Sequence, residues 1–146
     1  MNYYYFALLA ACCAYAFAAG GGPERIGAAA LAIGSVLTVV VISAPPIRFR
    51  SVEVAVVVVD ILCLIIYVAL ALRADRFWPI WASALVGVGA LGHLGKWFSG
   101  PDLDRWAYAF SIAIWSYPIL ALIAIGTLNH QRRAARSRAS APRARA

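Results

Sequence analysis

Charged side chains are scarce in this chain, and their scarcity argues against a soluble globular domain. Only 13% of the 146 residues are charged, whereas 64% are hydrophobic. Soluble domains are about 25% charged and about 45–50% apolar. The residues between the hydrophobic runs are also too few to bury a soluble core of their own. We therefore expect a membrane protein, with the lipid bilayer as its first partner.

Sequence motifs of established chemistry are also lacking. Cys12, Cys13 and Cys63 have neither zinc-site nor haem-attachment spacing, and they lie in apolar stretches where free thiols behave as small hydrophobic groups. The chain has no nucleophile elbow, HExxH, CxxC or phosphate-binding loop. We accordingly predict no catalytic residue, no metal site and no cofactor, and enzyme activity has no support in the sequence.

Long hydrophobic runs occupy most of the chain instead. A helix of roughly 20 residues, at about 1.5 Å per residue, crosses the hydrocarbon core of a bilayer. We predict an all-α, polytopic transmembrane helix bundle that forms one domain over residues 1–131. Its five spans are expected at about residues 3–19, 26–43, 52–72, 77–97 and 105–128.

The first run is the weakest of these spans, and without it the bundle would have four. It contains a lipoprotein-like box at residues 9–12 and a signal-peptidase-like site at residues 16–18. A signal peptide, however, begins with a basic region, and no Lys or Arg precedes this run. We expect the segment to be retained as an uncleaved helix.

The third run carries an acidic residue, Asp60, inside the membrane. A carboxylate at such a depth costs on the order of 2.5–3.5 kcal/mol on insertion scales, so it usually faces protein or a water-filled cavity. Glu53, Asp60 and Tyr67 recur every seven residues and share one helix face. This face is expected to pack against the other helices.

Partners for Asp60 follow from the rise per residue. Counted from the outer ends of the spans, Asp60 lies ~12 Å deep, His93 ~6 Å, and Ser35, Thr38 and Ser111 at roughly 8–12 Å. One hypothesis is a proton or cation relay through Asp60 and His93. The other is a protonated Asp60 bonded to a hydroxyl, which links helices with ~0.6–2 kcal/mol. The second, simpler interpretation is the prediction.

The two histidines are not expected to share a haem. His93 lies near the outer ends of the spans, whereas His130 follows the last span at the inner face. Their levels differ by roughly 30 Å by the rise per residue. One iron therefore cannot bind both.

A mixed cluster of charges gathers at the outer ends of the spans. It consists of Glu53, Lys96, Asp102, Asp104 and Arg105. Mixed charges in short loops usually form a solvated face with weak local ion pairs. A metal or anion site is the alternative, although no two of these residues have motif spacing.

Helix packing and helix ends can be predicted from small residues, Asp and Pro. Ala30 and Gly34 form a small-xxx-small pair that admits a neighbouring backbone. Asp104 is placed to cap the last span. Pro118 should kink that span and leave the carbonyl of Ile114 unpaired. The fourth span should pack closely through its glycines, Gly87, Gly89, Gly92 and Gly95.

The C-terminal segment, residues 132–146, is rich in Ala, Arg and Ser and has no apolar periodicity. We expect it to be disordered. Its arginines are expected to bind anionic lipid, at ~1 kcal/mol per basic residue, rather than nucleic acid. The predicted lipid-binding residues are Arg132, Arg133, Arg136 and Arg138.

Two segments carry a resemblance to a known kind of protein. RADRFWPIW at residues 73–81, together with WAYAFSIAIWSYPILALIAIGTLNHQRR at residues 106–133, resembles small multi-pass membrane proteins of alphaproteobacterial type. The resemblance implies a multi-pass topology in a bacterial cytoplasmic membrane. It implies no particular activity.

The leading functional hypothesis is a non-enzymatic accessory or scaffold protein. It would pack through Gly and Ala faces against itself, as a homo-oligomer, or against a membrane-protein partner. The first alternative is a small transporter or channel component that uses Asp60. The second is a redox or membrane-enzyme subunit, which would require a bound cofactor.

The distribution of Lys and Arg predicts the topology. With five spans, nine of these residues fall on the side of the C-terminus and four on the other side. The positive-inside rule then places the N-terminus outside and the C-terminus inside. A reporter that is active only in the cytoplasm should therefore work when fused after Arg138 and fail when fused at Pro46. Activity at Pro46 would overturn this orientation.

Overall fold

The computed structural model describes residues 3–42, 53–99 and 104–140, and in these residues it contains helices and no strand. The helices are α1 (Tyr3–Ala19), α2 (Gly22–Val41), α3 (Val54–Arg73), α4 (Trp78–Ser99), α5 (Arg105–Ala113) and α6 (Ser116–Ser140). The predicted helical class is confirmed.

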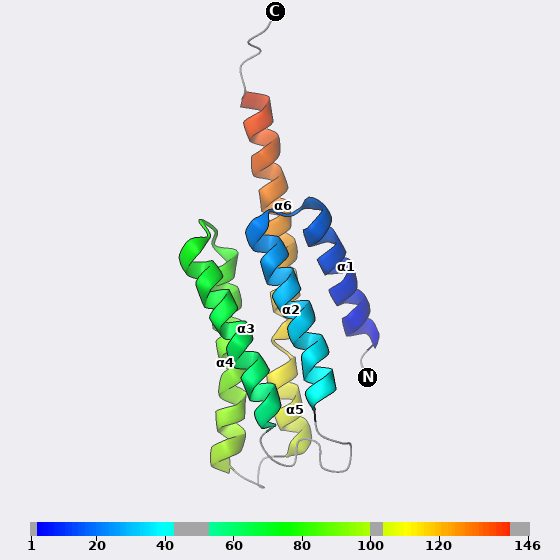
Figure 1. The fold of residues 1–146 in the computed structure, drawn as a ribbon, viewed down its shortest axis with the longest axis vertical. Coiled ribbons are helices and arrows are strands. Elements are labelled where there is room, and N and C mark those ends of the chain that lie inside the picture. Colours follow the sequence, from blue (N-terminus) through cyan, green and yellow to red (C-terminus); the bar gives the residue numbers. More distant parts are fainter. Residues whose placement is uncertain (1–2, 43–52, 100–103, 141–146) are drawn as a thin grey trace, which may run out of the picture.

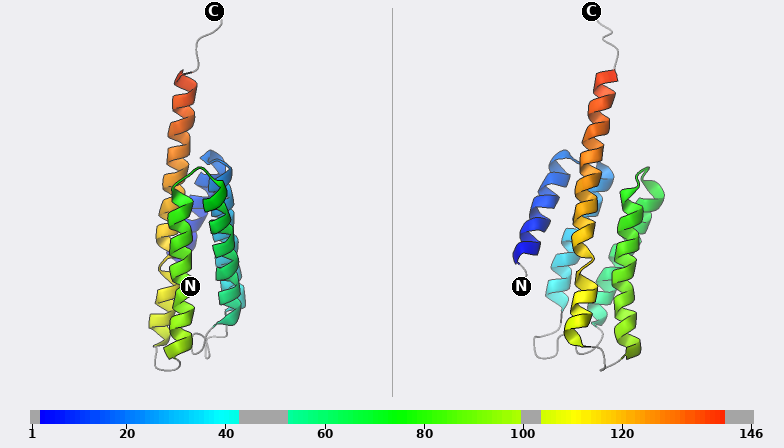
Figure 2. Two further views of the ribbon diagram at one scale, coloured as in Figure 1. Left: turned by 90° about the vertical axis from the view of Figure 1, so that its left-hand side faces the viewer. Right: turned by 180° about the vertical axis from the view of Figure 1, so that it is seen from behind.

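The helices run up and down beside one another in a single bundle (Figure 1). Helix α3 packs between α2 and α4, while α1 packs on α2 and α6. Helices α5 and α6 follow one another along one line (Figure 2). Helix α1 begins only partway along the bundle, so it covers α2 and α6 but does not reach the end at which α5 begins.

Three parts of the chain are long and apolar enough to cross a membrane. They are α2, α3 and the α5–α6 stretch Trp106–Ser140, and α1 is a shorter apolar helix. Helix α4 does not meet the same combined test of length and apolarity. The structure thus supports a membrane protein with three candidate spans. It does not confirm the predicted five.

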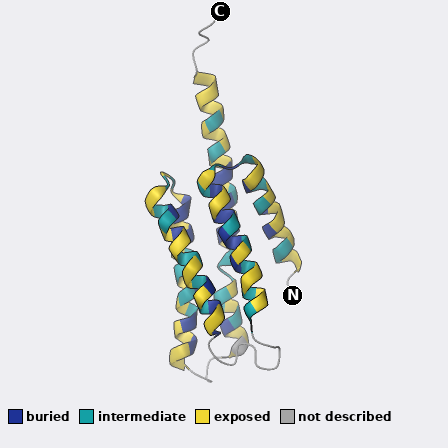
Figure 3. Ribbon diagram, viewed as in Figure 1, coloured by how far each residue is buried: buried dark blue, intermediate teal, exposed yellow. Residues whose placement is uncertain are grey.

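The outer surface of the helices is apolar. Many large hydrophobic side chains along the bundle are exposed. Examples are Val40 at 73%, Ile65 at 59% and Leu91 at 60%. Figure 3 shows exposed residues along the outward faces of α1, α2 and α3. Such a surface is costly in water and favourable in lipid, which agrees with the candidate spans.

The break between α5 and α6 follows from Pro118. Proline has no N–H to donate and its ring clashes with the preceding turn. The helix stops at Ala113 and restarts at Ser116. The helix is interrupted near Pro118, but α5 and α6 stay along one line (Figure 2). The carbonyl of Ile114 is not unpaired, because it accepts a hydrogen bond from the Tyr117 N–H at 3.4 Å.

The start of α5 is also as predicted. Asp104 Oδ2 accepts hydrogen bonds from the N–H groups of Trp106 at 2.8 Å and Ala107 at 3.1 Å. These bonds satisfy two of the free N–H groups at the helix start. The cap therefore fixes where α5 begins.

The C-terminal segment differs from the predicted disordered tail. Helix α6 continues through residues 132–140, and it extends beyond the end of the bundle (Figure 1). Ala and Arg are strong helix formers, and extending an existing helix needs no new nucleation. Residues 141–146 lie outside the described part of the chain.

Trp78 packs closely against two glycines of neighbouring helices. Its side chain is only 5% exposed, whereas the other two tryptophans of α4, Trp81 and Trp97, are 65% and 68% exposed. Its indole lies between Gly27 of α2 and Gly126 of α6, where added Cβ atoms would come within 2.5 and 2.6 Å of the ring. The two glycines make room for the indole.

Small residues also bring α2 and α3 together. A Cβ at Gly34 would lie 2.7 Å from Cys63 Sγ, and this thiol donates a hydrogen bond to the Ala30 carbonyl at 3.8 Å. The predicted small-xxx-small contact is confirmed. In α4, Gly92 lies against α5, but a Cβ at Gly95 would meet nothing within 4 Å. The prediction for the α4 glycines therefore holds only in part.

Two glycine substitutions test this packing. Gly27→Ala should lower the stability in detergent by about 1–3 kcal/mol, because its methyl group would overlap the buried Trp78 ring. Gly95→Ala is the matched control, and it should be neutral or slightly stabilising because its site is open. Thermal unfolding of both variants checks the prediction. Equal stability of the two variants would contradict it.

Candidate functional site

The membrane carboxylate of α3 is hydrogen-bonded to a histidine of α4. Asp60 Oδ2 lies 2.9 Å from His93 Nε2. The imidazole is 2% exposed, while the Asp60 side chain is 25% exposed. A buried ring therefore holds one oxygen of a carboxylate that is open on its other side.

The second nitrogen of the imidazole is held by a tyrosine of α5. His93 Nδ1 lies 2.6 Å from Tyr108 Oη, and the two rings meet edge to face with centroids 5.6 Å apart. The Glu53 N–H donates a hydrogen bond to the same hydroxyl at 3.4 Å. We call Asp60, His93, Tyr108 and the Glu53 N–H the Asp60 network.

The hydrogen-bond partners define a consistent proton arrangement. If Asp60 is ionised, it can only accept, so Nε2 of His93 carries the proton. In a neutral imidazole Nδ1 then accepts, and the Tyr108 hydroxyl donates to it. That hydroxyl still accepts from the Glu53 N–H. Moving one proton from Nε2 to Asp60 and one from Tyr108 to Nδ1 would reverse both bonds without moving a heavy atom.

The sequence explains how three helices supply this network. The seven-residue stripe of α3 places Tyr67 and Glu53 in the interior, with 0% and 6% exposure, and Asp60 on the same face. Gly92 admits α5, since a Cβ there would lie 3.1 Å from Ser111 and from Ile112. The capped start of α5 sets the height of Tyr108, which is fully buried.

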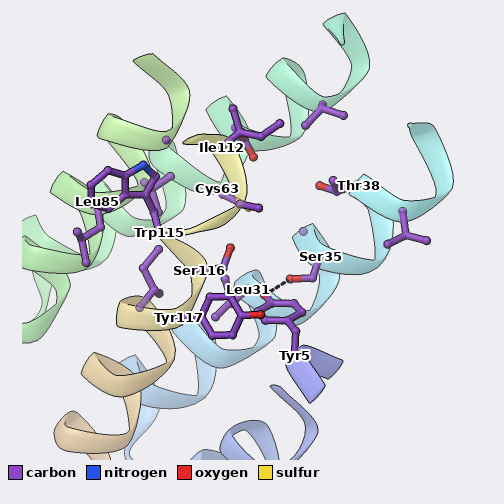
Figure 4. Close-up of a pocket in the computed structure, with 18 of the residues that line it drawn as sticks. Tyr5, Leu31, Ser35, Thr38, Cys63, Leu85, Ile112, Trp115, Ser116 and Tyr117 are labelled. Carbon is purple, nitrogen blue, oxygen red and sulfur yellow. Dashed lines mark hydrogen bonds between the residues drawn. The ribbon is translucent and has the colours of Figure 1, made fainter. Parts of the chain in front are cut away.

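A cavity of about 580 Å³ borders the carboxylate. Its walls come from every helix of the bundle, and most of the lining side chains are apolar or aromatic. Figure 4 shows Tyr5 and Ser35 joined by a hydrogen bond, with Ser116 and Tyr117 of α6 next to them. Asp60 is the only lining residue with a formal charge within the described part of the chain.

The predicted hydroxyl partners of Asp60 lie elsewhere. Ser35 bonds to Tyr5 at 2.7 Å, and Ser111 donates to the Tyr108 carbonyl one turn back at 2.8 Å. Thr38 lines the cavity with Asp60. The structure therefore brings His93 to Asp60 but bonds none of the three hydroxyls to it.

The predicted outer-face cluster contains both buried and exposed residues where the structure describes it. Glu53 and Lys96 are buried, with 6% and 3% exposure, close to the Asp60 network. Asp104 is exposed and caps α5. Asp102 lies outside the described residues, and the side chain of Arg105 is likewise not described.

A second buried acid, which the sequence analysis did not single out, lies at the opposite end of the bundle. Glu24 is 0% exposed, and its carboxylate accepts from Trp78 Nε1 at 2.9 Å and from the Gly21 N–H at 3.0 Å. Its only sequence signal is its position in the first turn of α2, behind Pro23. Both bonds join helix ends, so Glu24 has a structural explanation.

His130 lies at the same end as Glu24 and far from His93. Its Nδ1 is 3.2 Å from an Arg76 nitrogen, and the ring lies against Gly21. The two histidines belong to opposite ends of the bundle, so the structure separates them as expected. The predicted lipid-binding residues continue from here along exposed turns of α6, at Arg132, Arg133, Arg136 and Arg138.

Comparison with known proteins gives no assignment: no family model, curated protein or solved structure matches the chain. The described residues also bring together no group of three His, Cys, Asp or Glu side chains of the kind that holds a metal ion. The case for a function therefore depends on the Asp60 network and its cavity.

Proposed function

We propose that the protein is a small membrane transport component in which the Asp60 network takes up and releases a proton. One observation carries this proposal: the carboxylate that faces the cavity is bonded to an imidazole, whose other nitrogen is bonded to a phenol. Histidine is the side chain that most readily exchanges protons near neutral pH. Intramembrane carboxylates with such partners commonly belong to proton relays.

The structure favours this role over structural glue. A protonated carboxyl that only links helices needs one acceptor, and Ser35 and Thr38 line the same cavity. Asp60 is instead paired with a second titratable group, and its side chain, which is 25% exposed, lines the cavity. A linking residue has no need of either feature.

Other titratable side chains, from several helices, surround the Asp60 network. Their charges and hydrogen bonds will set the pH at which the network exchanges protons. They are Tyr5 of α1, the Glu53 carboxylate before α3, Cys63 and Tyr67 of α3, Lys96 of α4 and Tyr117 of α6.

The finer points of topology belong to the same proposal. We place α1 and α4 in the bilayer beside the three candidate spans, in a bacterial cytoplasmic membrane with the C-terminus inside. Helix α4 belongs there because its buried His93 faces the membrane carboxylate. The arginines of α6 then lie at the inner surface, where they attract anionic lipid.

The second candidate is the accessory or scaffold role. Gly95 favours it, since this residue is exposed on α4 and a Cβ there would meet nothing within 4 Å. Another helix, from a second copy or a membrane partner, has room to approach at this point. The Asp60 network has no part in such a role.

Proton uptake into proteoliposomes tests the transport proposal. With a potassium diffusion potential as the driving force, the protein should acidify the lumen faster than protein-free liposomes do. Asp60→Asn keeps the shape and some hydrogen bonding but cannot titrate, so it should reduce uptake to the protein-free rate.

The control is Asp75→Asn, the same chemical change at an exposed residue beyond the end of α3. It should transport like the wild type. Wild-type uptake at the protein-free rate, or full uptake by a folded Asp60→Asn variant, would overturn the proposal.

A further inference from the structure

We propose that the cavity beside Asp60 binds a lipophilic organic cation. This inference rests on the proposed function, because the Asp60 carboxylate would both exchange the proton and bind the ligand. It goes further because it names the class of molecule that the cavity accepts. Four features of the cavity point to this class.

The first feature is size. A volume of about 580 Å³ lies in the range of about 300–1,000 Å³ that is usual for small-molecule pockets. Ions such as sodium need only a few oxygen atoms at short range and no such space. The cavity therefore suits an organic molecule rather than a bare metal ion.

The second feature is charge. Asp60 is the only formally charged residue among the described residues that line the cavity. Its Oδ2 is bonded to His93, and no donor among the described residues bonds to Oδ1. In a medium of low dielectric, a cation beside this oxygen gains strong attraction, whereas an anion is repelled. The carboxylate thus selects the sign of the ligand.

The third feature is the aromatic lining. Tyr5, Phe6 and Tyr117 form one cluster in which the Tyr5 ring meets the others edge to face, at centroid distances of 5.4 and 5.3 Å. Trp106 and Trp115 also line the cavity. Aromatic rings attract cations through their faces and bury apolar substituents. A cation with an apolar body therefore fits better than a hydrophilic one.

The fourth feature is a way in. Helix α1 begins partway along the bundle and does not extend beside the first turns of α5 (Figures 1 and 2). Ile42, which follows the last residue of α2, and the exposed Trp106, in the first turn of α5, line the cavity. A molecule that dissolves in the bilayer can approach from this side.

Equilibrium binding of two ions of equal shape and opposite charge tests the inference. Tetraphenylphosphonium and tetraphenylborate should be titrated separately into the purified protein in detergent, with empty micelles as the background. The phosphonium should bind saturably, with an affinity at least about tenfold above that of the borate, because Asp60 distinguishes their charges. Equal binding of both ions would show that the cavity binds apolar molecules without selecting their charge, and it would overturn the proposal.

Substitutions then locate the site. Asp60→Asn should weaken phosphonium binding by about tenfold or more, and Asp75→Asn should leave it unchanged. Asp60→Glu restores the charge and should recover most of the affinity. Phosphonium binding that survives in a folded Asp60→Asn protein would place the ligand elsewhere and refute the inference.

The binding result and the proton-uptake result can fail separately. Saturable, Asp60-dependent phosphonium binding without proton uptake would support the ligand site and overturn the transport proposal. Asp60-dependent proton uptake without phosphonium binding would do the reverse.

Discussion

A carboxylate inside an apolar bundle must be compensated, and this constraint explains much of the structure. Asp60 lies on α3, the most apolar helix, where an uncompensated charge is costly. Its compensation comes from two other helices, through His93 on α4 and Tyr108 on α5. Gly92 and the Asp104 cap make the approach of α5 possible. Beside this carboxylate the helices enclose the cavity that Asp60 lines.

The opposite end of the bundle differs, because a large side chain fills the space between the helices there. There the Trp78 indole fills the space between Gly27 and Gly126, and its N–H satisfies the buried Glu24 carboxylate. Tyr67 adds a hydrogen bond to the Gly27 carbonyl at 2.8 Å. These two hydrogen bonds join α2 to α4 and α2 to α3. A closely packed indole and the cavity beside Asp60 thus lie on the same helices, toward opposite ends of the bundle.

The sequence predicted the features that depend on local order. Helix positions, the Asp104 cap, the Pro118 break and the buried stripe of α3 all follow from periodicity and from residues with fixed backbone preferences. Depth counting also brought His93 near Asp60. It could not choose between His93 and the three hydroxyls, because depth fixes height but not the rotation of each helix. Tyr108 and Glu24 were missed for the same reason. Residues 132–140 were wrongly expected to be disordered, because propagation of α6 outweighed the polar composition of this segment.

The central claim is that the His93 imidazole carries a proton while its two ring nitrogens are hydrogen-bonded to Asp60 and to Tyr108. Nitrogen NMR of the imidazole tests this claim most directly. The chain has two histidines, so ¹⁵N-histidine labelling gives two rings, and a His130→Gln variant assigns them. We predict that Nε2 of His93 carries a proton in a hydrogen bond to Asp60, and that this signal shifts strongly in Asp60→Asn. A His93 spectrum that is the same in the wild type and in folded Asp60→Asn would contradict the account.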